Sequence, residues 1–245
     1  MGDGRGDLRG KVALVTGAGS GLGEATARAF AGAGCRVACL DVNQAAAERV
    51  AADLPGEHLA LPCDLLDARA VFAAVERAAG QFGRLDVAVN AAGTDHVLPV
   101  ERLTVEQWDQ IIGVNLRGPF LIAKAALPYL ARQGGHIVNV ASTAAVRAWA
   151  CASAYHASKW GLVGFSRGLG VEGRELGVRV TTVIPGGMRT HFFDRFPEQG
   201  IPLPDERNLQ EPATVAATIL FAVQLPPESA LQELIVTPVT ETSWP

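Results

Sequence analysis

Two side chains that can exchange a proton lie one helical turn apart in the second half of the chain. Tyr155 and Lys159 stand in "ASAYHASKW" (152–160), a segment of otherwise small residues with a helical composition. Residues i and i+4 share one face of a helix, so the phenol and the ammonium are expected to point the same way. A phenol has a pKa of about 10, and a nearby ammonium is expected to lower it. The pair predicts acid/base chemistry on an alcohol or a carbonyl.

A serine strengthens this interpretation of the pair. Ser142 ends the apolar run "HIVNVAS" (136–142), thirteen residues before Tyr155. The carboxyl ends of strands are where open α/β sheets bind their ligands. Without such a neighbour, Tyr155 would be interpreted as a packed core residue and Lys159 as a solvated one.

A glycine-rich turn near the start of the chain predicts a phosphate site. The segment "TGAGSGLG" (16–23) joins an apolar run to a helical pattern, with glycines at 17, 21 and 23. Residues without Cβ let the backbone approach a pyrophosphate, and the N-terminus of the following helix offers free N–H groups. In that context the turn indicates dinucleotide binding, although a glycine-rich turn alone is weak evidence.

The next apolar run ends in Asp41, and this acid bears on the choice of cofactor. A carboxylate at this position accepts hydrogen bonds from the adenosine ribose hydroxyls of a dinucleotide. Neither Ser20 in the glycine-rich turn nor Val42 supplies a cation for a 2′-phosphate. We therefore expect NAD as the cofactor, unless Arg36 or another arginine lies nearer in space than in sequence.

The elements that must position these residues alternate along the chain. Short apolar runs predict strands at 11–16, 35–41, 58–64, 85–93, 136–142, 178–187 and 231–239. Helical patterns fill the intervals at 24–34, 45–56, 67–83, about 104–133, 153–176 and 211–223. Pro119 and Pro128 are expected to bend or segment the long region 104–133. Apolar strands without strict alternation are typical of a parallel sheet buried on both faces, so the fold class is α/β, doubly wound.

Composition limits the remaining possibilities. The chain has 245 residues, of which 49% are hydrophobic and 19% charged, with a net charge of −4. These values predict one domain over 11–245 behind a flexible arm at 1–10, with no nucleic-acid partner and no membrane span. The N-terminus lacks the apolar core of a signal peptide, so a cytoplasmic location is expected. Cys35, Cys39, Cys63 and Cys151 are expected to be reduced and buried. The five histidines show no metal-ligand spacing, so no metal is expected.

The motifs together resemble the short-chain dehydrogenase/reductase family of the compact single-domain type. They are "TGAGSGLG", "NAAG" (90–93), Asn115 in "VNLRG", Ser142 and "YHASK" (155–159). The resemblance implies a Rossmann-like sheet of seven strands in the order 3-2-1-4-5-6-7 and a nicotinamide cofactor. It also implies that Ser142 binds the substrate oxygen, while Asn115 holds a water that connects Lys159 to solvent. Lys159 would also bind the nicotinamide ribose.

The site residues expected on this basis fall into three groups. The catalytic group is Asn115, Ser142, Tyr155 and Lys159. The cofactor contacts are Gly17, Ser20, Gly21, Leu22, Gly23, Asp41, Asp64, Leu65, Asn90, Ala91, Gly93, Tyr155, Lys159, Pro185, Gly186, Met188 and Thr190. By the resemblance, Asp64 contacts adenine, Asn90 lines the groove, and Thr190 reaches the carboxamide or the phosphates. The substrate contacts are Ser142, Trp149, Tyr155, Phe192 and Phe193.

The substrate is less well determined than the reaction. Phe192, Phe193 and Phe196 lie in "THFFDRFPEQGIP" (190–202), which either forms a lid over an apolar substrate or anchors the loop to the core or to another subunit. We expect an NAD(H)-dependent oxidoreductase for a secondary alcohol and a ketone. A 3-oxoacyl thioester reductase, a hydroxy-acid dehydrogenase and a catalytically idle dinucleotide sensor or scaffold are the alternatives. Small and apolar helices near 111–133 and 153–176 predict a homo-oligomer, a tetramer or otherwise a dimer.

Overall fold

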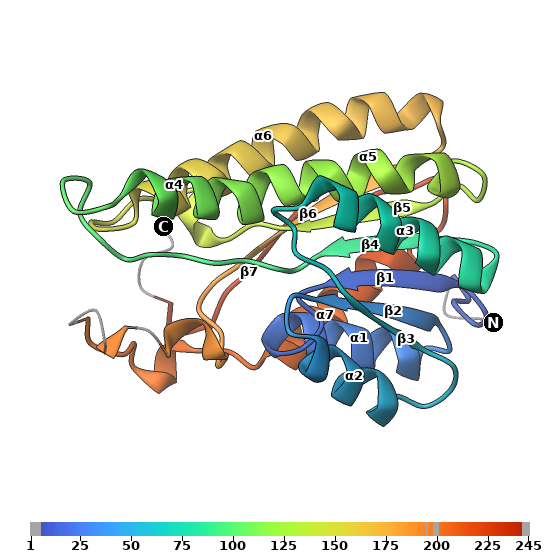
Figure 1. Ribbon diagram of the computed structural model, residues 1–245, viewed down its shortest axis with the longest axis horizontal. Helices are drawn as coiled ribbons and strands as arrows, with labels where there is room; N and C mark the ends of the chain where they lie inside the picture. The colour runs from blue at the N-terminus through green and yellow to red at the C-terminus, as the bar shows by residue number, and fades with distance from the viewer. Residues whose placement is uncertain (1–5, 195, 198–200, 242–245) are drawn as a thin grey trace.

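A parallel sheet in the order β3-β2-β1-β4-β5-β6-β7 runs through the middle of the molecule (Figure 1). The computed structural model describes residues 6–194, 196–197 and 201–241. The strands are β1 (Val12–Thr16), β2 (Arg36–Asp41), β3 (Leu59–Pro62), β4 (Val87–Asn90), β5 (His136–Val140), β6 (Arg179–Pro185) and β7 (Glu233–Val236). The expected seven-stranded order is therefore confirmed.

Helices cover both faces of this sheet, as Figure 1 shows. One face carries α1 (Gly21–Gly32), α2 (Gln44–Asp53) and α7 (Pro212–Gln224). The other face carries α3 (Ala68–Phe82), α4 (Val105–Ile112), α5 (Gly118–Leu130) and α6 (Ser153–Glu175). Because both faces are covered, the strand residues can be apolar without alternation, as the sequence shows.

Two apolar layers hold the helices against the sheet. Val75 of α3 and Ile122 of α5 are fully buried in the first layer. Phe30 of α1 and Ile219 of α7 are fully buried in the second. Burying one such side chain contributes about 1.5–3 kcal/mol, so these layers fix the ends of the strands where the site lies.

The long helical region between β4 and β5 has an irregular middle. A π-helical segment, Gly113–Arg117, separates α4 from α5. Pro119 lies at the start of α5 and lacks the N–H that would bond the carbonyl of Asn115, which explains the predicted break. Pro128 does not break the helix, because α5 continues through it to Leu130. Pro128 removes the N–H that would bond the carbonyl of Lys124, and α5 ends two residues after it.

The part of the N-terminal arm that the structure describes is packed on the body. Leu8 is 2% exposed, and the backbone N–H of Gly6 donates to the carbonyl of Gln224 at 2.7 Å. Residues 1–5 of the arm expected at 1–10 lie outside the described residues. Within the described ranges, none of the helices is long and apolar enough to cross a membrane.

Candidate active site

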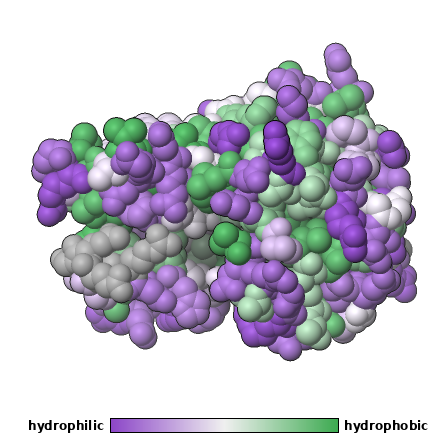
Figure 2. Space-filling model, in the orientation of Figure 1, coloured by the Kyte–Doolittle hydropathy of each residue, from purple (hydrophilic) through white to green (hydrophobic). Residues whose placement is uncertain are grey.

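A cavity of about 990 Å³ opens at the carboxyl ends of the strands. It runs from the glycine-rich turn, past Tyr155, to the segment that follows β6. In Figure 2 the surface is hollowed near the middle of the view, to the right of the atoms drawn in grey. This location agrees with the position of ligand sites in open α/β sheets.

Most of the expected site residues line this cavity. They are Gly17, Ser20, Gly21, Leu22, Gly23, Asp41, Asp64, Leu65, Ala91, Gly93, Ser142, Trp149, Tyr155, Lys159, Pro185, Gly186, Met188, Thr190, Phe192 and Phe193. Asn90 and Asn115 are not among the lining residues. Ligand roles for the lining residues stay predictions.

The glycine-rich turn fits the pyrophosphate of a dinucleotide. Gly17 has a φ of 67°, and a Cβ at this position would lie 2.8 Å from the Cα of Ala92. A Cβ on Gly23 would collide with the carbonyl oxygen of Gly17. The two glycines therefore let the turn pack closely on Ala92 and on its own backbone, at the N-terminus of α1, where anions are favoured.

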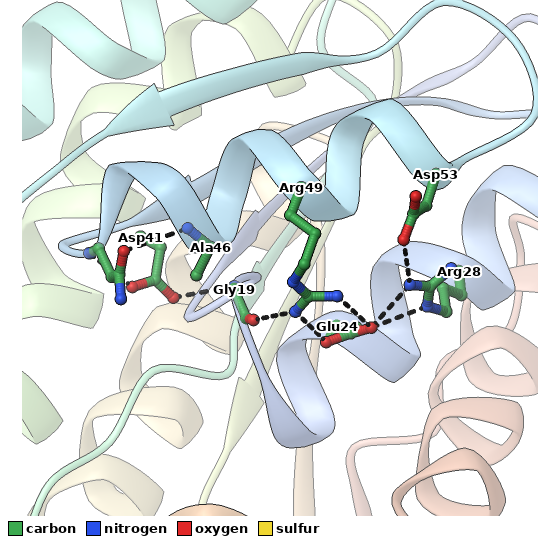
Figure 3. Close-up of polar contacts among 8 residues, drawn as sticks. Gly19, Glu24, Arg28, Asp41, Ala46, Arg49 and Asp53 are labelled. Atoms are coloured by element: carbon green, nitrogen blue, oxygen red, sulfur yellow. Dashed lines mark hydrogen bonds and ion pairs between the residues drawn. The ribbon is translucent and has the colours of Figure 1, made fainter.

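Asp41 and Arg49 bond the two backbone polar groups of Gly19 in this turn (Figure 3). The Oδ2 of Asp41 accepts from the backbone N–H of Gly19 at 2.9 Å, and its Oδ1 accepts from Asn43 N–H at 2.9 Å. Arg49 of α2 donates from Nη2 to the Gly19 carbonyl and to Glu24 Oε2, both at 2.9 Å. The glycine-rich turn is therefore fixed to β2 and to α2.

Two arginines that could bind a 2′-phosphate, Arg36 and Arg49, already have protein partners. Arg36 begins β2, at the opposite end of the strand from Asp41, and donates to the carbonyls of Gly10 and Phe82. Arg49 pairs with Glu24. None of the described residues that line the cavity beside Asp41 is a lysine or an arginine.

Tyr155 and Ser142 form the polar centre of the cavity. The Ser142 side chain interacts with the Tyr155 phenol. Ser142 Oγ also accepts from the backbone N–H of Ala144 at 3.1 Å, which fixes its rotamer. Desolvation raises the pKa of the Tyr155 phenol, the interaction with Ser142 lowers it, and the Asp95 carboxylate raises it. The net direction is upward, so the phenol stays protonated at neutral pH.

The expectation that Lys159 lowers the pKa of Tyr155 is wrong for this arrangement. The Nζ of Lys159 donates to the carbonyl of Val140 at 2.9 Å. It lies over the Tyr155 ring, 5.6 Å from the ring centroid, and does not bond the hydroxyl. Lys159 is 4% exposed, and burial lowers its own pKa to about 8 while Asp95 opposes that shift.

Asn115 is buried behind the cavity wall, where its side chain bonds two other segments of the chain. Its Oδ1 accepts from the backbone N–H of Thr94 at 2.9 Å. Its Nδ2 donates to the Thr94 carbonyl at 2.9 Å and to Ser158 Oγ at 3.1 Å. The side chain connects the π-helical segment to the end of β4 and to α6. Its side-chain hydrogen bonds are directed to protein groups, and the expectation that it holds a water stays a prediction.

Asn90 does not line the groove, contrary to expectation. It is 2% exposed, and its Nδ2 donates to Asn139 Oδ1 at 2.8 Å. Asn139 in turn donates to Ser166 Oγ of α6 at 2.8 Å. Because side chains alternate along a strand, Asn90 at the end of β4 points into the layer under α6.

The substrate end of the cavity has an aromatic wall. The Tyr155 and Phe192 ring centroids lie 5.6 Å apart, Phe192 and Phe193 also 5.6 Å, and Phe193 and Phe196 5.1 Å. Trp149 lines the same end and packs its ring on His156. Residues 195 and 198–200 of the expected lid lie outside the described residues, and substrate contact by the phenylalanines stays a prediction.

Sequence reasoning missed three charged residues in this part of the cavity. They are Asp95, Arg147 and Glu241. Asp95 follows the "NAAG" motif by two positions, which is a signal that could have identified it. Nothing local indicates that Arg147 and Glu241 meet, because they come from distant parts of the chain.

The expectation of buried cysteines is confirmed for three of the four. Cys35, Cys39 and Cys63 are buried, and desolvation raises their pKa values to about 12, 12 and 11. Cys151 is only half-buried, and its φ is 63°. Among the described residues there is no group of histidine, cysteine or acidic side chains arranged to hold a metal.

Comparisons with known proteins agree with this geometry. A family model described as short chain dehydrogenase matches residues 11–200. A D-threitol dehydrogenase of Mycolicibacterium smegmatis is 46% identical over 182 residues, which cover 73% of this chain and 70% of that protein.

Two solved structures share the fold at full length. A crystal structure of a 3-ketoacyl-(acyl-carrier-protein) reductase from Brucella melitensis complexed with NADH has a TM-score of 0.86 at 33% identity, covering 95% of this chain and 98% of that one. An alcohol dehydrogenase from the archaeon Thermococcus sibiricus complexed with 5-hydroxy-NADP has a TM-score of 0.85 at 27% identity, covering 96% and 99%.

Proposed function

The chain belongs to the short-chain dehydrogenase family, and from that premise we propose that it is an NAD(H)-dependent oxidoreductase of secondary alcohols and ketones. One observation carries the proposal. Tyr155 and Ser142 lie together in the wall of a cavity that also reaches the glycine-rich turn. A catalytically idle nucleotide sensor has no use for such a pair.

The residues of this chain fit the parts of a dinucleotide. The glycine-rich turn and the N-terminus of α1 would hold the pyrophosphate, Asp41 the adenosine ribose, and Lys159 the nicotinamide ribose. When bound, the nicotinamide exchanges a hydride with the reacting carbon. NAD is proposed over NADP because Asp41 opposes a 2′-phosphate, although the family relatives with solved structures include complexes of both kinds.

Ser142 and Tyr155 would act on the oxygen of the substrate. Ser142, held in place by the Ala144 N–H, orients the oxygen toward the phenol. A protonated Tyr155 donates its proton to that oxygen during reduction, and during oxidation the same phenol oxygen receives the proton. The Lys159 ammonium lies over the Tyr155 ring, 5.6 Å from its centroid, and would bind the nicotinamide ribose rather than the phenol oxygen.

The test is the change Tyr155→Phe, which removes the oxygen and keeps the ring. With a panel of alcohols and ketones, we expect turnover to fall by roughly 10²–10⁴-fold, the usual contribution of a positioned acid or base. NADH binding, measured by its fluorescence, should persist. Wild-type turnover in this variant would overturn the role of Tyr155, and NADH binding by the wild type without turnover of any substrate would favour the sensor.

A further inference from the structure

The substrate end of the cavity contains an ion pair that the proposed reaction does not use. Arg147 belongs to the loop that follows Ser142, and Glu241 to the segment that follows β7. Nη2 of Arg147 lies 3.3 Å from Oε2 of Glu241, and their side chains are 22% and 13% exposed. Both residues line the cavity that also holds Tyr155 and Ser142.

Contacts through Trp149 and His156 fix the loop that carries Arg147 to the helix that carries Tyr155. The guanidinium lies over the Trp149 ring, with Cζ 5.3 Å from the ring centroid. Trp149 packs edge-on against His156, the residue after Tyr155, with centroids 4.4 Å apart. His156 Nδ1 donates to the Ala144 carbonyl at 2.8 Å, and Nε2 accepts from the Trp149 N–H at 3.1 Å. The position of the guanidinium is thus tied to α6.

Arg147 retains hydrogen-bonding capacity toward a ligand. Its Nε–H is buried and has no hydrogen-bond partner within the described part of the chain. Its contacts with Glu241 and Thr143 Oγ1 are long, at 3.3 and 3.4 Å, against about 2.7–2.9 Å for a tight charge-assisted bond. A ligand oxygen near Arg147 could accept a hydrogen bond from this Nε–H. Leaving a buried donor without an acceptor is unfavourable, so such a bond would favour binding.

The charges at this end of the cavity favour a neutral ligand. Two acids, Asp95 and Glu241, balance the cations of Arg147 and Lys159. A substrate carboxylate placed at Arg147 would lie beside Glu241, and like charges at close range are unfavourable. A hydroxyl group both donates and accepts, so it can bond the carboxylate and the guanidinium together.

We propose that Arg147 and Glu241 form a binding site for a hydroxyl group of a neutral polyhydroxylated substrate, at a carbon away from the reacting one. The inference rests on the proposed function and specifies its substrate class. The aromatic wall of Phe192 and Phe193 would face the C–H groups of the same substrate. The pair selects against hydroxy acids, which carry a carboxylate, and against simple alcohols, which lack the second hydroxyl.

The experiment compares three four-carbon substrates with NAD: threitol, butan-2-ol and 3-hydroxybutyrate. The wild type should prefer threitol. In Arg147→Met and Glu241→Leu, kcat/KM for threitol should fall about 10–100-fold, mainly through KM, because a buried polar partner is lost. For butan-2-ol the change should stay within about 3-fold, since that substrate makes no such bond. NADH binding should be unchanged.

A matched control comes from another ion pair on the same side of the molecule. Arg189 Nη1 lies 2.6 Å from Glu211 Oε1, both side chains are exposed, and neither residue lines the cavity. Arg189→Met and Glu211→Leu should leave the ratio of threitol to butan-2-ol activity as in the wild type. A charge reversal, Glu241→Lys, should raise the activity on 3-hydroxybutyrate relative to threitol by about 10-fold or more.

The outcomes separate this inference from the proposed function. If the wild type oxidises no alcohol, the proposed function fails. If it oxidises butan-2-ol or 3-hydroxybutyrate as well as threitol, the function stands and the substrate inference is overturned. The inference would also be overturned if the Arg147 and Glu241 variants lost kcat/KM equally for threitol and butan-2-ol. It would likewise be overturned if Glu241→Lys did not raise the activity on 3-hydroxybutyrate relative to threitol.

Discussion

At the scale of single residues, the site depends on how each polar side chain is already engaged. Lys159 Nζ donates a hydrogen bond to the Val140 carbonyl, and Ser142 Oγ accepts one from the Ala144 N–H. Tyr155 lines the cavity, with Phe192 and the Lys159 ammonium beside its ring. Its raised pKa follows from this enclosure, because the phenolate loses solvation without gaining a bonded cation.

Cofactor choice is expected to depend on the charge of Asp41. NADP would place a phosphate dianion against this carboxylate, so we expect NAD(H) to be favoured by roughly 10²-fold in kcat/KM, equivalent to about 2.7 kcal/mol. Asp41→Ala should narrow that preference by weakening NAD and admitting NADP. Equal or higher kcat/KM with NADP(H) in the wild type would contradict the assignment.

The variant Asp41→Asn separates charge from loop anchoring. Its amide oxygen can still accept from the Gly19 N–H, which Asp41 bonds at 2.9 Å. In Asp41→Asn, we expect the ratio of kcat/KM with NAD to kcat/KM with NADP to fall about 10-fold. The affinity for NAD should stay higher in Asp41→Asn than in Asp41→Ala. If the two variants behave alike, the anchoring of Gly19 rather than the charge determines the preference.

Acid stability should depend on His136, a buried residue far from the chemistry. Its Nε2 bonds Thr181 Oγ1 at 2.7 Å, and burial lowers its pKa from 6.5 to about 3. The unfolded chain therefore binds a proton below pH 6.5 that the native state does not bind, so stability falls as pH falls from 6.5 toward 3. For one proton the slope is about 1.4 kcal/mol per pH unit.

This prediction is checked with His136→Gln, which keeps an N–H donor for Thr181 and does not titrate. Urea unfolding is measured for both proteins at pH 7 and pH 5. Between pH 7 and pH 5, the unfolding free energy of the wild type should fall more than that of the variant. Parallel losses in both proteins would assign the acid sensitivity to carboxylates instead.

At the scale of elements, helix α2 supports the glycine-rich turn through one arginine. Arg49 bonds the Gly19 carbonyl and Glu24, while Glu24 also accepts from Arg28 Nε at 3.0 Å (Figure 3). A Cβ on Gly19 would lie 2.8 Å from Ala46 Cβ, so the turn and α2 are in direct contact. The π-helical segment has a comparable role for the opposite wall, where it directs Asn115 toward α6.

Removing the α2 support should weaken cofactor binding without affecting chemistry. We expect Arg49→Met to raise the NADH Kd about 3–10-fold, since the arginine is half-exposed and its bonds are partly screened. At saturating cofactor, kcat should be unchanged. Arg28→Met is the control, because Arg28 shares Glu24 but does not touch the turn. Equal Kd values in wild type and Arg49→Met would show that the turn is fixed by Asp41 alone.

At the scale of the whole molecule, apolar side chains stand on the outer helices of one face. Trp160 of α6 is 54% exposed and Phe120 of α5 is 43% exposed. Phe120 packs edge-on against Phe165, so the two helices present one continuous surface. An exposed apolar surface of this kind is typical of a subunit interface.

We expect a homo-oligomer, a tetramer or otherwise a dimer, with this surface at a twofold axis. Light scattering at micromolar concentration should give the mass of the oligomer for the wild type. The double change Phe120→Glu and Trp160→Glu should reduce that mass, because charges would be buried at the interface. Phe72→Glu, on α3 and 39% exposed in the wild type, is the control. A wild-type monomer would contradict the expectation.

The sequence alone determined the features that depend on short-range patterns. Apolar runs and helical spacing located the strands and helices, the glycines marked the turn, and the four-residue spacing placed Tyr155 and Lys159 on one helix face. The strand order came from the resemblance. Local sterics and periodicity cause these features, so they can be read from neighbouring residues.

Tertiary structure alone decided which polar groups meet. Asn90 and Asn115 carry the expected residue types, but packing turns them toward Asn139 and toward Thr94 and Ser158, away from the cavity. The bond of Lys159 to the Val140 carbonyl and the pairing of Arg147 with Glu241 also join distant segments. Such contacts depend on how layers pack against the sheet, and no local pattern in the sequence encodes that arrangement.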